Sequence, residues 1–148
     1  MYNRKQKNAF TIIEIMVVIV ILGVLASLAI PRLGTAIELF RSKEGLHVLQ
    51  SILQAQLSAD VDVAEGRIGS YNLAYLDVDI VNLKNFNAPV LDFNGSGSPP
   101  NVTINSVNYP VYAHIVRLTN AYTLYIQVDG TILCNTQAIC TQMQYAPW

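Results

Sequence analysis

An apolar run near the N-terminus constrains this chain more than any other feature. Residues 15–30 contain no charged side chain, and only Gly23 and Ser27 interrupt the aliphatic residues. Residues 10–13 extend the run to about 21 residues, close to the length that a helix needs to span a bilayer core of about 30 Å. We therefore predict a membrane-spanning helix, with the lipid bilayer as its first partner.

The charges on either side of this run predict its orientation. Arg4, Lys5 and Lys7 precede it without any acidic residue, whereas basic and acidic residues alternate after it. Because basic flanks tend to stay in the cytoplasm, we expect the N-terminus to remain inside and the C-terminal part to be exported.

The rest of the composition excludes several classes of protein. The chain has 148 residues with nine basic and ten acidic side chains, so it has no overall field that would attract nucleic acid. At this length one domain is expected, which excludes a TIM barrel or a two-domain enzyme.

Glu14 decides between three interpretations of the apolar run. A carboxylate within a membrane helix costs about 2.5–3.5 kcal/mol near the centre and less toward an end. A secretory signal cleaved after residues 27–29 (Ser-Leu-Ala) would have no use for this charge. A simple anchor helix would leave it equally unexplained.

The residues around Glu14 support the third interpretation. The order Lys7-Asn8-Ala9-Phe10-Thr11-Ile12-Ile13-Glu14, followed by the aliphatic run and Pro31, resembles the N-terminus of the type IV pilin superfamily. The resemblance implies that a prepilin peptidase cuts between Ala9 and Phe10 and then methylates the new amine of Phe10. The family usually has Gly where this chain has Ala9, and alanine is the nearest substitute in size.

Cleavage would also give Glu14 a partner. It removes the three basic leader residues and creates an amine at Phe10, four residues before Glu14. A carboxylate in hydrocarbon must be paired, protonated or hydrated, and the Phe10 amine of a neighbouring subunit can pair with it. There are two alternatives: Glu14 pairs with the Phe10 amine of its own chain, or it lies at the membrane interface.

Two residues are expected to make the apolar helix flexible. Gly23 and Pro31 both weaken a helix, by about 1 and about 3 kcal/mol relative to Ala in a helix interior. In the family, the stretch around the matching proline is where the helix curves or melts on packing into a filament. Alternatively, Pro31 simply marks the exit from the membrane.

After Pro31 the pattern becomes that of an amphipathic helix, which we expect to continue from Phe10 to about Asp62. Gly45 is a further weak point within it. The predicted buried stripe comprises Leu39, Leu46, Leu49, Leu53 and Leu57, with Val48 and Ile52 beside it.

The remaining chain predicts loops followed by a sheet. Residues 71–88 have the pattern of a strand-like edge or a loop, and residues 89–100 have the composition of a surface loop. Residues 102–104, 111–116, 122–128 and 131–133 have strand patterns, and Asp129-Gly130 predicts a hairpin between the last two. The fold class is therefore α+β: a long N-terminal helix, membrane-spanning in its first half, packed on a small antiparallel sheet.

Cys134 and Cys140 are the only cysteines, and they either pair or serve as two small apolar side chains. Zinc would need further ligands, and His47 and His114 do not lie beside the cysteines in the sequence. Export of this part of the chain favours a disulfide, and a C-terminal disulfide loop is common in type IV pilins.

No catalytic, cofactor or metal site is predicted. There is no phosphate-binding loop, no nucleophile near a histidine and no zinc motif, so we do not expect an enzyme. We expect His47 and His114 to be surface or packing residues. The acidic residues Asp60, Asp62, Glu65, Asp77 and Asp79 fit no calcium loop, and we expect them to be solvated.

These features predict a structural filament subunit with three parts: a leader at 1–9, a hydrophobic assembly helix at 10–31 and an exported head at 32–148. Its partners would be the prepilin peptidase, other pilin subunits and an inner-membrane assembly machinery. The resemblance places it in the bacterial inner membrane and then in an extracellular pilus; the cysteine pair favours the pilus because major pseudopilins usually lack one.

Two alternatives remain open. A pseudopilin in the periplasmic pseudopilus of a type II secretion system would share the whole N-terminus. An exported, membrane-anchored binding domain could use a surface lined by aromatic residues. The candidates for that surface are Tyr109, Tyr112, Tyr122, Tyr125, Tyr145 and Trp148.

Overall fold

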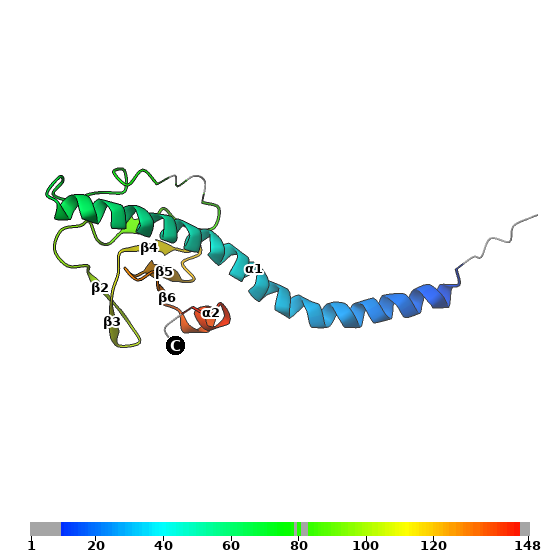
Figure 1. The fold of residues 1–148 in the computed structure, drawn as a ribbon. Coiled ribbons are helices and arrows are strands. Elements are labelled where there is room, and N and C mark those ends of the chain that lie inside the picture. The colour runs from blue at the N-terminus through cyan, green and yellow to red at the C-terminus, as the bar shows by residue number, and fades with distance from the viewer. Residues whose placement is uncertain (1–9, 79, 81–82, 146–148) are drawn as a thin grey trace, which may run out of the picture. The chain divides into compact units, whose positions relative to one another are not determined.

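The computed structural model describes residues 10–78, 80 and 83–145, and of residues 31 and 32 it describes the helical backbone alone. The predicted leader with Ala9, together with Asp79 and Trp148, lies outside the described residues. The elements are α1 (Ile12–Ala64), β1 (Val90–Leu91), β2 (Asn101–Ile104), β3 (Val107–Pro110), β4 (Ala113–Val116), β5 (Thr123–Ile126), β6 (Ile132–Cys134) and α2 (Gln137–Gln142) (Figure 1).

The chain divides into two compact units, Met1–Ile37 and Glu38–Trp148, and α1 contributes to both. The first unit consists, among its described residues, of Phe10, Thr11 and the N-terminal part of α1. The second unit, which we call the head, contains the rest of α1 and all the strands. The α+β class predicted from the sequence is confirmed.

The head is built on a four-stranded antiparallel sheet with the order β1-β4-β5-β6. Ile115 pairs with Leu124 in the centre, and Leu124 pairs in turn with Cys134 at the β6 edge. The predicted hairpin at Asp129-Gly130 is confirmed, because these residues connect β5 to β6. Gly130 has a φ of +84°, a left-handed conformation that favours glycine.

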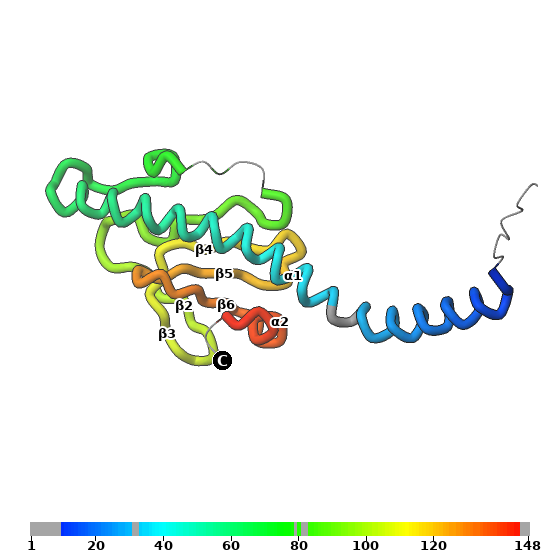
Figure 2. Tube along the Cα trace, turned by 45° about the vertical axis from the view of Figure 1, so that its right-hand side comes forward, coloured from blue at the N-terminus to red at the C-terminus, as the bar shows by residue number. Residues whose placement is uncertain are grey.

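The head part of α1 covers one face of this sheet, as both views show (Figures 1 and 2). Leu49, Ile52 and Leu53 of the helix share one core with Leu124 and Ile126 of β5. Residues three and four apart on a helix share a face, and alternate residues of a strand share a face. The two periodicities therefore explain which side chains meet.

The opposite face of the sheet is covered by the separate β2–β3 hairpin. Ile104, Val111 and Leu133 form a second, smaller core, against which Val102, Tyr109 and Tyr125 pack. Tyr125 and Leu133 alternate along their strands with Leu124 and Cys134, which belong to the first core. The sheet is thus buried on both faces, and residues 101–110 form a separate two-stranded sheet that is not part of the main one.

The structure corrects several details of the sequence interpretation. Leu57, predicted on the buried stripe, is 37% exposed, because the buried face of the helix at this level carries Gln56 and Ala59 instead. The proposed loop of residues 89–100 contains the edge strand β1, and β3 and α2 had not been predicted. Residues 71–78 form turns and irregular structure, and residues 87–88 have no regular structure.

Candidate functional site

The candidate functional site is the first turn of α1, where Thr11 and Glu14 form a reciprocal cap. The backbone N–H of Glu14 donates to Thr11 Oγ1 at 3.3 Å, and the backbone N–H of Thr11 donates to Glu14 Oε2 at 3.4 Å. Backbone N–H groups at the start of a helix lack the usual carbonyl partner four residues earlier, and these bonds supply one. The Glu14 N–H also donates to the Thr11 backbone oxygen at 3.2 Å. The arrangement is a capping box, in which Thr11 precedes the helix and Glu14 is its third residue.

Sequence reasoning had identified Glu14 but not Thr11. The signal was present, because Thr-x-x-Glu before an apolar run is the sequence pattern of a capping box. Glu14 therefore has a role within its own chain that is independent of any neighbour. Its carboxylate also lies at the positive end of the helix dipole, which favours a negative charge there.

Glu14 is nevertheless available to a further partner. The side chain is exposed, and among the described residues its Oε1 atom accepts no hydrogen bond, whereas Oε2 takes part in the cap. Phe10 is 78% exposed and lies directly before the capping residue. The structure therefore places Phe10, Thr11 and Glu14 together at one exposed helix terminus.

The segment that follows exposes apolar side chains on every side. All its large apolar residues from Ile12 to Ile30 are between 47% and 77% exposed. By length and composition, Ile12–Ile30 could cross a membrane, with a mean hydropathy of 2.9 over the best window. A helix that is apolar all round is stable in lipid or among other apolar helices, and not in water.

Gly23 and Pro31 both lie within α1. The helix continues through both positions, and a Cβ on Gly23 would meet no atom within 4 Å outside its own helix backbone. Their proposed role in helix flexibility stays a prediction. Gly45, the other predicted weak point, is a place of close packing, since a Cβ there would lie 2.9 Å from Phe86 Cζ.

Glu38 joins the head part of α1 to the sheet. Arg117 Nε donates to Glu38 Oε1 at 2.7 Å, and the Tyr122 hydroxyl donates to the same oxygen at 3.0 Å. Arg117 is 6% exposed, and its Nη1 also donates to the backbone oxygen of Asn85 at 2.5 Å. This network connects the helix, the sheet and the loop before β1.

The charges in this network stabilise each other. The hydrogen bond from Arg117 is the main cause that lowers the pKa of Glu38, and the same bond raises the pKa of Arg117. The pKa of Tyr122 is raised, chiefly by burial and to a smaller extent by its hydrogen bond to Glu38. Both members of the Glu38–Arg117 pair are therefore charged at neutral pH.

A second polar cluster lies near the end of α1. The hydroxyls of Tyr71 and Tyr112 donate to the two carboxylate oxygens of Asp60, at 2.7 and 3.0 Å. Burial, followed by the bond to Asp60, raises the pKa of Tyr112 to about 12. The expectation that Asp60 is merely solvated was wrong, because it orients two core tyrosines.

The remaining candidate residues have structural surroundings. Cys134 and Cys140 form a disulfide, with Cα atoms 5.9 Å apart, and both side chains are buried. Nδ1 of His114 lies 2.8 Å from Asp92 Oδ2, and the Asp62 carboxylate pairs with Arg67. Among the described residues, no group of three or more His, Cys, Asp or Glu side chains could hold a metal ion.

The described aromatic candidates do not form the exposed surface that a binding domain would need. Tyr112 is 7% exposed and Tyr122 is 1% exposed, and both belong to the main core, against which Tyr145 packs. Tyr109 and Tyr125 pack against the second core. The ligand-binding alternative therefore loses these five residues as an exposed surface, and Trp148 lies outside the described residues.

A long helix with an apolar, exposed N-terminal segment, followed by an antiparallel sheet, is a pilin-like architecture. Comparison with known families adds the more specific finding: residues 4–30 match the family model of the prokaryotic N-terminal methylation motif. The chain therefore carries the hallmark of type IV pilins and pseudopilins. No curated protein and no solved structure gives a significant match to the chain.

Proposed function

We propose that this protein is a structural subunit of a type IV pilus-like filament. In this proposal the precursor is inserted in the bacterial inner membrane with its head outside the cytoplasm. A prepilin peptidase cuts before Phe10 and methylates its amine, and the subunits then polymerise through their N-terminal helices. The observation that carries the proposal is the methylation motif at residues 4–30, with Glu14 inside an exposed apolar helix.

The exposed helix explains why polymerisation would be favourable. The apolar side chains of Ile12–Ile30 have no partner within the described chain, and they gain contacts only from lipid or from other subunits. Contacts between different surfaces of identical subunits give open helical polymers when the rotation does not close. The proposed role is therefore assembly, and the peptidase chemistry belongs to the partner.

The test is the N-terminal mass of the mature chain. When the protein is expressed with a prepilin peptidase, membrane fractions should contain a chain that begins at a methylated Phe10. A chain that begins at Ile30 would identify a cleaved secretory signal, and an intact Met1 would identify a simple anchor. Either result would overturn the filament proposal.

The extracellular pilus is our choice over the secretion pseudopilus. Its support is the Cys134–Cys140 disulfide, a feature common in the resembled pilins and usually absent from major pseudopilins. Deletion of the gene in its host should remove sheared surface filaments and leave type II secretion unchanged. Loss of secretion with normal surface filaments would favour the pseudopilin.

A further inference from the structure

A phenylalanine in the head is largely exposed to solvent among the described residues. Phe40 is 77% exposed, more than any other large apolar residue from Glu38 onward among those described. The residues after it on the same helix, Arg41 and Lys43, are basic and exposed. Arg41 pairs with Glu38, but Lys43 has no ion pair among the described residues.

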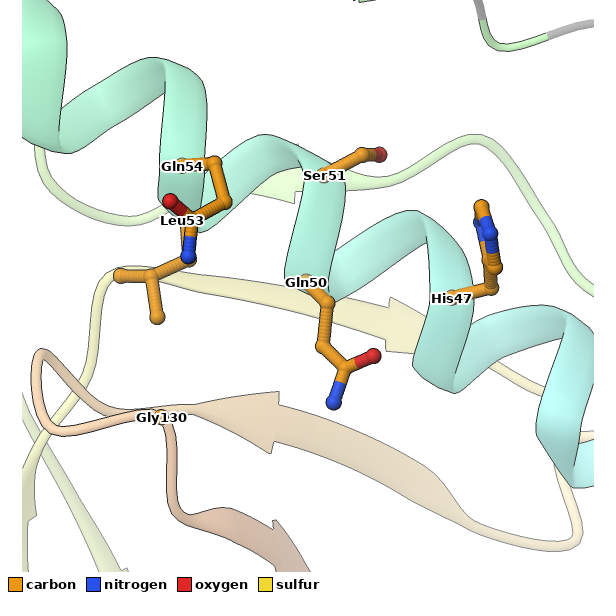
Figure 3. Close-up of a pocket in the computed structure, with 6 residues that line it drawn as sticks. All are labelled: His47, Gln50, Ser51, Leu53, Gln54 and Gly130. Carbon is orange, nitrogen blue, oxygen red and sulfur yellow. The ribbon is translucent and has the colours of Figure 1, made fainter.

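A groove of about 390 Å³ lies farther along the same helix (Figure 3). Its walls are one side of α1 and the turn between β5 and β6. Gln50 and Leu53 point from the helix toward the side where Gly130 lies. The lining residues are His47, Gln50, Ser51, Leu53, Gln54 and Gly130.

Gly130 lies on the turn side of the groove, opposite Leu53. A Cβ on Gly130 would project toward Leu53, with 4.0 Å to its Cδ2 atom. The volume of the groove falls within the range of about 300–1,000 Å³ that ligand pockets have. Among the described residues, no hydrogen bond occupies the side chains of Gln50 or Gln54, so these groups are free to contact a ring inserted from outside.

The turn that forms one wall of the groove is acidic. Asp129 directly precedes Gly130, is exposed, and has no basic partner among the described residues. The Thr131 backbone N–H donates to its carboxylate at 2.8 Å and lowers the pKa of Asp129. A negative charge therefore stands beside the groove at neutral pH, and a positive charge stands beside Phe40.

We propose that Phe40 of one copy of this chain docks into the His47–Gln54 groove of a second copy, with Lys43 of the first facing Asp129 of the second. The complementary charges identify the occupant as a second copy. Because the aromatic residue and the groove are different surfaces, the contact repeats from copy to copy without closing. The inference rests on the proposed filament function and adds the contact between heads that the apolar helices alone do not supply.

Filament yield tests the contact in the full-length chain expressed with its assembly machinery. Phe40→Ala should lower sheared filament yield at least about tenfold, as expected when a buried aromatic anchor is truncated. N-terminal processing and membrane-pool abundance should not change. The matched control is Leu118→Ala, which removes another apolar side chain that is 50% exposed. A filament yield for Phe40→Ala equal to that of Leu118→Ala would overturn the proposal.

The groove is tested in the same way. Gln50→Lys should obstruct it and lower filament yield, while Gln142→Lys makes the same chemical change at an exposed position of α2 outside the groove. Lys43→Asp and Asp129→Lys should each reduce the yield, and the double variant should restore it at least partly. Additive loss in the double variant would contradict the charge pairing.

Cross-linking identifies the geometry in membranes. A photoreactive aromatic residue, p-benzoylphenylalanine, in place of Phe40 keeps the ring that the contact needs. Two differently tagged chains, only one of which carries this residue, should give a mixed cross-link whose attachment site on the other chain lies within residues 47–54 or at the turn around Gly130. Attachment at position 40 of the other chain, or no mixed product although filaments form, would overturn the docking contact but leave the filament function intact.

Two further outcomes separate the possible failures. If the wild-type chain forms no filaments, the proposed function fails. A mixed cross-link in the membrane would then still support the docking contact. The absence of both filaments and cross-link would overturn the proposed function and the docking contact together. Fluorescence of Phe40→Trp in unassembled membrane chains tests lipid as the occupant instead. Protection from an aqueous quencher, measured against wild type, before any assembly would show that lipid covers this residue and would overturn the proposal.

Discussion

Glu14 can act as a helix cap and as a partner for a neighbouring amine, and these two roles depend on different properties of the side chain. The cap requires a hydrogen-bond acceptor for the Thr11 N–H, whereas pairing with the Phe10 amine of a neighbour requires a negative charge. Removal of one member of a buried ion pair commonly costs about 3–5 kcal/mol. Loss of a helix cap costs about 1 kcal/mol.

These magnitudes predict how two variants differ. Glu14→Gln keeps the acceptor and removes the charge, and Glu14→Ala removes both. We expect both to lower filament incorporation strongly, because register between apolar helices depends on the charge, and to leave the head folded. Sheared filament yield relative to membrane-pool abundance is the measurement, with circular dichroism of the full chain in detergent as the control. If Glu14→Gln forms filaments at the wild-type yield, the charge of Glu14 is not needed for assembly and its role is that of a helix cap.

At the scale of the element, α1 approaches the rest of the head most closely at one glycine among those it contains. Gly45 faces the ring of Phe86, and a Cβ there would come within 2.9 Å of it. Phe86 is 2% exposed, packs edge-on against Tyr122 and lies under Arg117. The ring therefore has little freedom to move away from the helix.

Two glycine substitutions in the same helix should have different effects. Gly45→Ala should destabilise the head by about 1–3 kcal/mol, the usual range for overpacking a core. Gly34→Ala adds the same methyl group where no atom outside the helix backbone lies within 4 Å, so it should not lower the head's stability. Thermal unfolding of the detergent-solubilised chain, followed by near-UV circular dichroism of its tyrosines, is the measurement. Equal melting temperatures for both variants would show that Phe86 adjusts freely.

At the scale of the head as a whole, the Glu38–Arg117 pair holds helix, sheet and loop together. The pKa of Glu38 is lowered from its ordinary value of 4.5, chiefly by the hydrogen bond from Arg117. Its stabilising contribution is therefore complete above about pH 4.5 and is lost as the pH falls through the lowered pKa. Protonation would leave the buried Arg117 without its counter-charge.

Acid unfolding should report this pair. We expect the melting temperature of the head to decrease when the pH drops below about 4.5. Glu38→Gln should lower the melting temperature at neutral pH and make it depend less on acid pH. The control is Asp62→Asn, which removes a more exposed ion pair and should have little effect, since such pairs contribute about 0–1 kcal/mol. An acid profile unchanged by Glu38→Gln would assign the acid sensitivity to other carboxylates.

Local sequence determined the features that depend on neighbours along the chain. The apolar run, the charge at Glu14, the hairpin at Asp129-Gly130 and the amphipathic period of the head helix were all predicted from the sequence, because helix and strand periodicities and turn preferences are short-range effects. The Thr11 cap belongs to the same class, since its pattern spans only four residues.

The tertiary structure alone decided which distant residues meet. Arg117 reaches Glu38 across 79 positions of sequence and Tyr112 reaches Asp60 across 52, and no local pattern encodes such partners. The two-residue strand β1 forms only because β4 offers it a ladder, and Leu57 is exposed because Gln56 and Ala59 occupy the buried face of the helix at this level. Likewise, Phe40 and its proposed groove became recognisable once the packing of the head showed which helix face stays uncovered.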